Sequence, residues 1–159
     1  MNQQYIQDLD QEDLLQRLLP FIAQTPYAEQ DAALLKKAVN ILQSRLVTLK
    51  EIGKRLALFF EENPVATDPD VLSLLRQETS KQVLAEFIRQ VESLESLTEE
   101  NLGSLMKNVQ NATNIKGKNL WLPLRYAITL EVQGPELKLI VDLFGREKCL
   151  RLARRALEL

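Results

Sequence analysis

The 159-residue sequence contains no histidine and a single cysteine, Cys149. Without histidine the chain cannot form a Ser–His–Asp triad, a His–Zn site or an imidazole acid–base group. A lone cysteine excludes an internal disulfide, which fits a reducing compartment. The glycine patterns that cradle phosphates, GxxxxGK[ST] and GxGxxG, are absent as well. Carboxylate pairs occur at Glu61–Glu62 and Glu99–Glu100, where we interpret them as solvated residues at helix ends. We therefore expect no catalytic site, metal or cofactor in this chain.

Long apolar runs are also lacking. The longest unbroken run, Leu56–Phe60, is far shorter than the roughly 20 residues that a membrane-spanning helix needs. The N-terminus is polar and acidic and does not resemble a signal peptide. Apolar residues make up 45% of the chain and charged residues 26%, as in ordinary folded proteins. We expect a folded cytoplasmic protein with no membrane partner.

Helical signals dominate what is present, and no stretch alternates with period two over a useful length. Asp10 and Thr98 stand at helix N-cap positions, and Asp68-Pro69 combines a cap with proline in the first turn. Thr48 and Glu51 have the spacing of a capping box. The prediction is an all-α fold of two small helical bundles, residues 1–95 and 96–159. The predicted helices cover residues 10–22 (with a kink or end at Pro20), 31–46, 48–62, 69–77, 80–94, 98–111, 120–130, 135–144 and 146–159.

Charge is unevenly distributed, although the net charge is only −2. Residues 101–130 contain no Asp or Glu and carry a net charge of +4. Residues 32–60 carry six basic residues against one acid, a net charge of +5. These cations are Lys107, Lys116, Lys118 and Arg125 in the first window, and Lys36, Lys37, Arg45, Lys50, Lys54 and Arg55 in the second.

Two interpretations of these basic windows stay open. Each window can be an ordinary solvated helix face. Alternatively, a polyanion partner requires clustered Lys and Arg and the removal of repelling carboxylates. Two separate windows favour a folded anionic backbone that is contacted in two places. Folded RNA fits this better than a membrane, because no helix pairs a basic face with a broad aromatic face.

The stretch 115–137 carries further features that suit RNA. Pro123 restricts the backbone just before Arg125, whose forked guanidinium could read a base edge. Trp121, between two leucines, is expected to anchor the core, with stacking on a splayed base as the alternative. Gly134-Pro135 predicts a helix N-terminus near Arg125, which is either an ordinary turn or a site for a phosphate or base carbonyl.

The order and spacing of several short motifs resemble the C-terminal anticodon-binding region of bacterial glutamyl-tRNA synthetases, class I aminoacyl-tRNA synthetases. Upstream, "NQQYI" (2–6) resembles an "NGxYI" element, and residues 34–51 are similar to a helix ending in "R..TL.E". The resemblance covers essentially the whole chain. The other motifs are Lys116-Gly117-Lys118, Pro123-Leu124-Arg125, Ala127-Ile128-Thr129, Gly134-Pro135-Glu136-Leu137 and Leu143-Phe144-Gly145-Arg146-Glu147.

The resemblance implies an α-helical cage that grips the anticodon loop of tRNA(Glu), as a monomer and without a DNA partner. Arg45 matches an arginine that reads the third anticodon base and helps to reject tRNA(Gln). Arg125 matches an arginine at the other end of the anticodon. Contacts to the loop backbone and bases are implied for Lys107, Lys116, Pro135 and Leu137.

The chain departs from the family pattern in two respects. Gln3 or Gln4 stands where the family has glycine in "NGxYI". The family's ATP-binding catalytic domain, with its HIGH- and KMSKS-like motifs, cannot be here because the chain has no histidine. ATP and Mg²⁺ are therefore implied only for a parent enzyme. The chain is expected to be a segment of a full synthetase, and the alternative is a standalone helical paralogue that binds a protein or acts as a regulator.

Overall fold

The computed structural model of the chain describes residues 3–61 and 64–159, and no strand occurs within these ranges. The chain divides into two compact units, residues 1–63 and 64–159. The expected boundary at 95/96 therefore falls inside the second unit. The reason is the helix α6 (Glu78–Glu92), which packs against α7 (Glu99–Thr113), α8 (Lys118–Thr129) and α9 (Leu137–Leu157). No described helix is both long enough and apolar enough to span a membrane.

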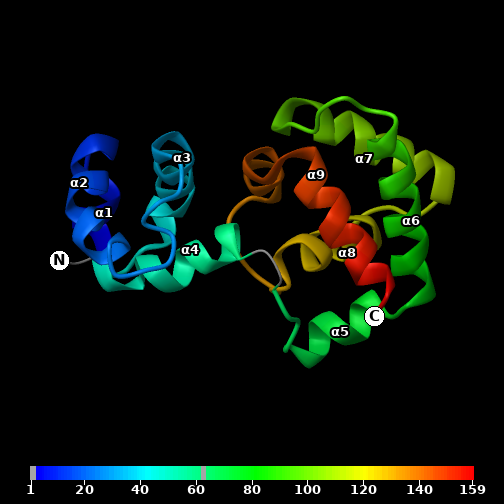
Figure 1. Cartoon of the computed structure of the whole chain (residues 1–159). Coiled ribbons are helices and arrows are strands. Elements are labelled where there is room, and N and C mark those ends of the chain that lie inside the picture. Colours follow the sequence, from blue (N-terminus) through cyan, green and yellow to red (C-terminus); the bar gives the residue numbers. More distant parts are fainter. Residues whose placement is uncertain (1–2, 62–63) are drawn as a thin grey trace. The chain divides into compact units, whose positions relative to one another are not determined.

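The first unit consists of short helices around one small apolar core (Figure 1). Its elements are α1 (Gln3–Asp8), α2 (Gln11–Ile22), α3 (Ala32–Leu42), the 3₁₀ turns η1 (Gln43–Arg45) and η2 (Leu49–Glu51), and α4 (Ile52–Phe60). Helix α2 packs against α3 and α4, and α1 contacts η1. The buried side chains are Ile6, Leu14, Leu18, Ile22, Leu35, Ala38, Val39, Leu42, Leu46, Ile52, Leu56 and Phe59.

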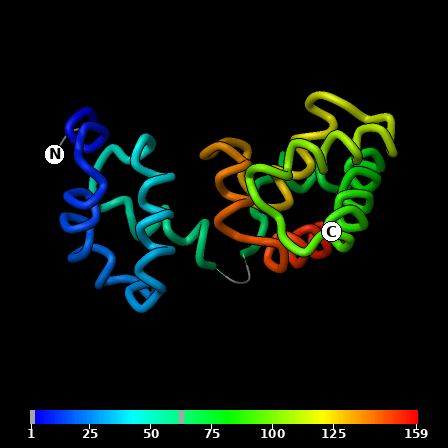
Figure 2. The backbone as a smooth tube through the Cα atoms, turned by 90° about the horizontal axis from the view of Figure 1, so that it is seen from above, coloured from blue at the N-terminus to red at the C-terminus, as the bar shows by residue number. Residues whose placement is uncertain are grey.

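The second unit begins with α5 (Pro69–Leu75), followed by α6 to α9. Helix α6 packs against α7, α8 and α9, and the last, C-terminal part of α9 runs beside α6 in both views (Figure 1, Figure 2). Helix α8 packs on both α5 and α9. The side chains with no exposed surface are Val71, Leu75, Val83, Leu84, Phe87, Val91, Met106, Val109, Leu124, Ile140, Val141, Cys149 and Ala153.

Most helix starts lie where local capping chemistry predicts them. Asp10 is the N-cap residue of α2, and Asp68 caps α5 by accepting a hydrogen bond from the Asp70 amide at 2.8 Å. Thr98 precedes α7, and its amide donates to Asn101 Oδ1 at 2.8 Å. The capping box predicted at Thr48 is wrong in detail. The Thr48 hydroxyl makes no capping hydrogen bond. The Glu51 carboxylate accepts a hydrogen bond from the Val47 amide and not from the amide of Thr48.

Helix ends and breaks agree less well with the predictions. Helix α2 continues through Pro20 to Ile22, so Pro20 does not end it. Gly145 breaks α9 as predicted, with φ 80° and ψ 175°, a conformation open essentially to glycine alone. The helix expected to begin at Pro135 begins at Leu137. The predicted end of α4 at Asn63 lies outside the described residues.

Two arginines of α9 hold the end of α6. The Arg146 Nε donates to the Leu94 carbonyl at 2.7 Å, and its Nη2 donates to the Glu92 carbonyl at 3.4 Å. These carbonyls belong to the last turn of α6 and the residues after it, where backbone acceptors lack intrahelical donors. Arg154 pairs with the Glu92 carboxylate at 2.9 Å. The second half of α9 is thereby fixed against α6.

Candidate nucleic-acid interface

Arg45 is the last residue of the turn η1, which joins α3 to the segment before η2. The turn is held between two buried leucines, Leu42 and Leu46, with exposed fractions of 1% and 0%. The Arg45 side chain is half-buried, and it makes no hydrogen bond or ion pair within residues 3–61 and 64–159. A guanidinium has five N–H donors in a rigid fork, so Arg45 presents an unused charge at a fixed place on the first unit.

Side-chain amides of two glutamines tie this turn to α1. The Gln43 Nε2, with two hydrogens to donate, lies within hydrogen-bonding distance of three carbonyl oxygens at the end of α1, those of Ile6, Gln7 and Leu9, at 3.0, 3.2 and 2.8 Å. In the opposite direction, the Gln7 Nε2 donates to the Ser44 carbonyl at 2.9 Å. Helix α1 and η1 therefore satisfy each other's backbone acceptors. The link holds the backbone of the turn that ends at Arg45, and the sequence pattern did not reveal it.

Four of the five remaining cations of the 32–60 window fall into two groups. Lys36 forms an ion pair with Glu12, and Arg55 lies 4.0 Å from the Glu51 carboxylate. Lys50 and Lys54 are exposed and have no acidic partner among the described residues. The usable positive charge of this window is thus smaller than the number of its basic residues suggests.

The three lysines of the acid-free window 101–130 remain exposed. Lys107 lies in the middle of α7, Lys116 in the loop after it, and Lys118 at the first position of α8. None of the three pairs with a carboxylate in the part of the chain that is described. The loop between α7 and α8 turns through two left-handed residues, Asn114 (φ 64°) and Gly117 (φ 66°). Lys116 and Lys118 thus lie in and directly after a tight loop, and Lys107 lies in the helix before it.

Arg125 lies in the last turns of α8 and is half-buried. Its Nη2 donates to the Pro135 carbonyl at 3.0 Å, which links α8 to the segment before α9. A Cβ at Gly134 would stand 3.5 Å from the Arg125 Nη1, so the guanidinium lies directly against this backbone. The Thr129 hydroxyl donates to the Arg125 carbonyl at 2.8 Å. The predicted proximity of Arg125 and Gly134-Pro135 is therefore present.

Pro135 and Leu137 lie next to Arg125 but are buried. Leu137 has an exposed fraction of 7%, and the Pro135 carbonyl is occupied by Arg125. Pro135 and Leu137 can therefore contribute to a nucleic-acid interface only through their backbone and through the shape of the surface. A recess of about 310 Å³ opens beside them, lined by Glu99, Leu102, Gly103, Trp121, Glu136, Leu137 and Lys138.

Trp121 is not the core anchor that its leucine neighbours suggested, because its exposed fraction is 39%. Helical spacing explains the error. Leu120 and Leu124 are four residues apart and both buried, whereas Trp121 stands on another face, three residues after Lys118 and four before Arg125. This spacing was readable from the sequence. It places an exposed indole on the same side of α8 as two cations.

The predicted site residues thus form three groups. Arg125, Pro135 and Leu137 come together where α8 meets the start of α9. Lys107 in α7 and Lys116 in the α7–α8 loop belong to the same unit, and Arg45 belongs to the first unit. Among the described residues, no three Asp, Glu or Cys side chains are grouped so as to hold a metal ion.

Solved structures of similar fold are larger than this chain. A glutamate tRNA ligase from Elizabethkingia meningosepticum matches with a TM-score of 0.85 and 20% identity, over 99% of this chain and 31% of that one. A glutamate-tRNA synthetase from Elizabethkingia anophelis matches with a TM-score of 0.81 over 99% of this chain and 30% of that one. The chain therefore has the fold of an all-helical portion of these proteins.

Sequence comparison identifies the family. The profile described as "Anticodon binding domain" matches residues 13–157, and the chain belongs to this family. The glutamate–tRNA ligase of Geobacillus stearothermophilus is 30% identical over 163 residues, which cover 99% of this chain and 33% of that protein. The enzyme of Listeria monocytogenes serotype 4b is 33% identical over 156 residues, 94% of this chain and 32% of that protein. The chain spans about a third of the length of these relatives.

Proposed function

We propose that the chain is the anticodon-recognising part of a glutamate–tRNA ligase and that it binds the anticodon loop of tRNA(Glu). The observation that carries the proposal is the family match over residues 13–157 together with relatives that are glutamate–tRNA ligases. The exposed lysines Lys107, Lys116 and Lys118 lie in a window without acidic residues and provide the positive charge that an RNA backbone requires. Since the chain corresponds to about a third of these relatives, the ATP-dependent ligase reaction is assigned to a part of the parent enzyme outside it.

Different residues serve different parts of the recognition. Lys107 and Lys116 neutralise phosphates, which contributes affinity but little selectivity. Arg45 and Arg125 discriminate bases. Both side chains are half-buried, and the Arg125 guanidinium is also held by its hydrogen bond to the Pro135 carbonyl. Pro135 and Leu137 shape the backbone against which Arg125 lies. The domain acts as a monomer in the cytoplasm, where tRNA is charged.

Titration of the chain with fluorescently labelled tRNA(Glu), followed by anisotropy at several salt concentrations, tests the proposal. Binding should weaken linearly on a log–log plot against salt. Lys107→Gln and Lys116→Gln should each reduce the slope by about 0.7–0.9 for each phosphate that is no longer neutralised. Arg76→Gln is a matched control, because Arg76 is exposed at the end of α5 and outside both basic windows. An absence of binding at low salt would contradict the proposal and favour a module that binds a protein.

Base recognition requires a second comparison, between tRNA(Glu) and tRNA(Gln). Arg45→Ala should reduce the preference for tRNA(Glu), because an arginine that reads a base edge contributes about 1–3 kcal/mol of discrimination. An equal loss of affinity for both tRNAs would show that Arg45 only positions the backbone. Arg125→Lys tests the second arginine in the same way, since lysine keeps the charge but loses the fork.

A further inference from the structure

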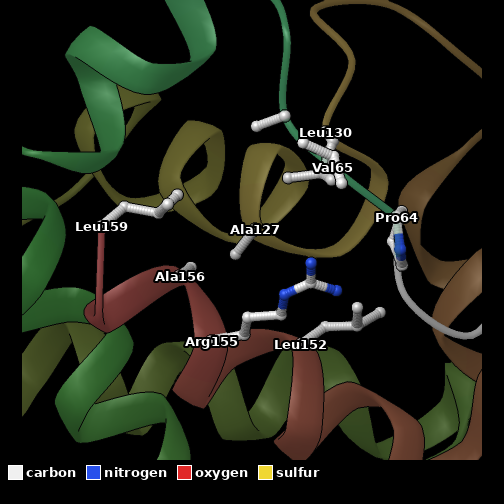
Figure 3. A pocket seen from close by; sticks show the side chains of 9 residues that line it. Pro64, Val65, Ala127, Leu130, Leu152, Arg155, Ala156 and Leu159 are labelled. Carbon is white, nitrogen blue, oxygen red and sulfur yellow. The ribbon is translucent and has the colours of Figure 1, made fainter.

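A cavity of about 100 Å³ opens between the start of the second unit, α8 and the end of α9. Figure 3 shows it from close by. Apart from Arg155, every residue that lines it is apolar: Pro64, Val65, Ala66, Ala127, Leu130, Leu152, Ala156 and Leu159. All belong to the second unit. A recess of this composition favours an aliphatic group over water, because it offers water almost no hydrogen-bond partners.

One charged group enters this apolar cavity. The Arg155 side chain extends from α9 toward the opposite wall, formed by Pro64, Val65 and Leu130 (Figure 3). Its Nη1 is buried and has no hydrogen-bond partner. Arg155 also makes no ion pair within residues 3–61 and 64–159. The neighbouring arginine differs, since Arg154 pairs with Glu92 at 2.9 Å.

An unpaired guanidinium nitrogen among apolar walls is unfavourable, because burial removes water from the Arg155 Nη1 and no protein acceptor replaces it. An anion supplies the missing interaction, and a carboxylate matches the fork of an arginine better than a spherical ion does. The walls add a second requirement, a small aliphatic body beside the carboxylate. A cavity of about 150 Å³ accommodates a molecule the size of benzene, so the space here suits an aliphatic group of only a few carbons.

We propose that the Arg155 cavity is a binding site for a small aliphatic monocarboxylate. The carboxylate pairs with the Arg155 guanidinium, and the aliphatic end lies against Ala127, Leu152 and Ala156. This site is independent of the proposed tRNA interface, because it uses none of the residues assigned to RNA. It remains testable whether or not the chain binds tRNA.

Isobutyrate is a suitable probe, and isobutyramide is its uncharged counterpart of nearly the same shape. Each is titrated into the ¹⁵N-labelled chain, and amide resonances are followed by NMR. Isobutyrate should shift resonances of Ala127, Leu130 and Ala156 in a saturable way. It should bind on the order of tenfold or more tightly than isobutyramide, as a charge-assisted hydrogen bond predicts. Equal affinity for the two probes, or linear shifts without saturation, would overturn the proposal.

Variants separate the guanidinium from the cavity. Arg155→Met keeps the length of the side chain but removes the charge, and should abolish the preference for isobutyrate. Ala66→Leu keeps the guanidinium and fills part of the cavity, so it should weaken both probes. Arg151→Met is the matched control, because Arg151 is an exposed arginine one turn earlier on α9, and it should bind like the unmodified chain. If Arg155→Met retains the preference while the chain is folded by circular dichroism, the assignment to Arg155 is wrong.

Discussion

Replacement of Gln43 by alanine removes the amide that joins η1 to the end of α1. The nitrogen lies 2.8–3.2 Å from three carbonyl oxygens, but it carries only two hydrogens. At most two full hydrogen bonds are therefore removed, each contributing about 0.5–1.5 kcal/mol net. The side chain is only partly buried, so water can satisfy some of the abandoned carbonyls. We expect Gln43→Ala to lower the free energy of unfolding of the first unit by about 1–3 kcal/mol.

Urea denaturation followed by circular dichroism measures this loss as a shift in midpoint at constant slope. Gln7→Ala is the matched control, because it removes a single hydrogen bond, from the Gln7 amide to the Ser44 carbonyl, between the same two elements. It should cost clearly less than Gln43→Ala. Gln43→Glu should be at least as harmful as alanine, since a carboxylate cannot donate to carbonyl oxygens and repels them.

The link to Arg45 is tested by a double-mutant cycle on tRNA(Glu) affinity, at a temperature where all variants are folded. If Gln43 acts through Arg45, Gln43→Ala should weaken binding in the unmodified chain but not in the Arg45→Ala background. Additive losses would refute this reasoning. A Gln43→Ala variant as stable as the control Gln7→Ala would refute the structural part as well.

Three further predictions concern the second unit. Arg146→Ala should lower the free energy of unfolding of the second unit by about 1.5–3 kcal/mol in urea denaturation, because a charged donor to the Leu94 carbonyl at 2.7 Å is removed. Arg154→Ala breaks the exposed ion pair with Glu92 and should cost under about 1 kcal/mol. Gly145→Ala should lower the free energy of unfolding by about 1–3 kcal/mol in the same assay, since φ 80° with ψ 175° is strained for any residue with a Cβ. An unchanged urea midpoint would contradict this. Burial raises the pKa of the Cys149 thiol to about 12, so above about pH 8.5 only the unfolded chain loses this proton. The free energy of unfolding should therefore fall between about pH 9 and 11, and it should fall less steeply in the Cys149→Ala variant. At about pH 8 the Cys149 thiol should resist alkylation until the chain unfolds.

Features that depend on neighbouring residues in the sequence were predictable. Asp68 and Thr98 mark helix starts because their capping interactions lie within three residues. Gly145 marks a break because no other residue adopts its backbone conformation easily. The all-α fold follows from helical periodicity throughout the chain. In each case the information that decides the structure is contained in one turn of the chain.

Features that depend on distant contacts were not predictable. The predicted domain boundary at 95/96 depended on the gap between the predicted helices 80–94 and 98–111. In the structure, α6 packs with the helices that follow this gap. Gln43 is an ordinary polar residue until α1, more than thirty residues earlier, brings three carbonyls to its amide. The Arg155 cavity likewise needs three separate segments. In the candidate site, the two basic windows could be found directly in the sequence. The burial of Pro135 and Leu137 could not be predicted from it.

The contact between α1 and η1 also has a mechanical consequence. Hydrogen bonds run in both directions across it, from Gln43 to α1 and from Gln7 to Ser44. Sliding α1 by about one ångström would stretch several of them beyond hydrogen-bonding distance at once. We therefore expect the helix and the backbone of the turn to move together. A displacement of the first helix would then shift the backbone that carries Arg45.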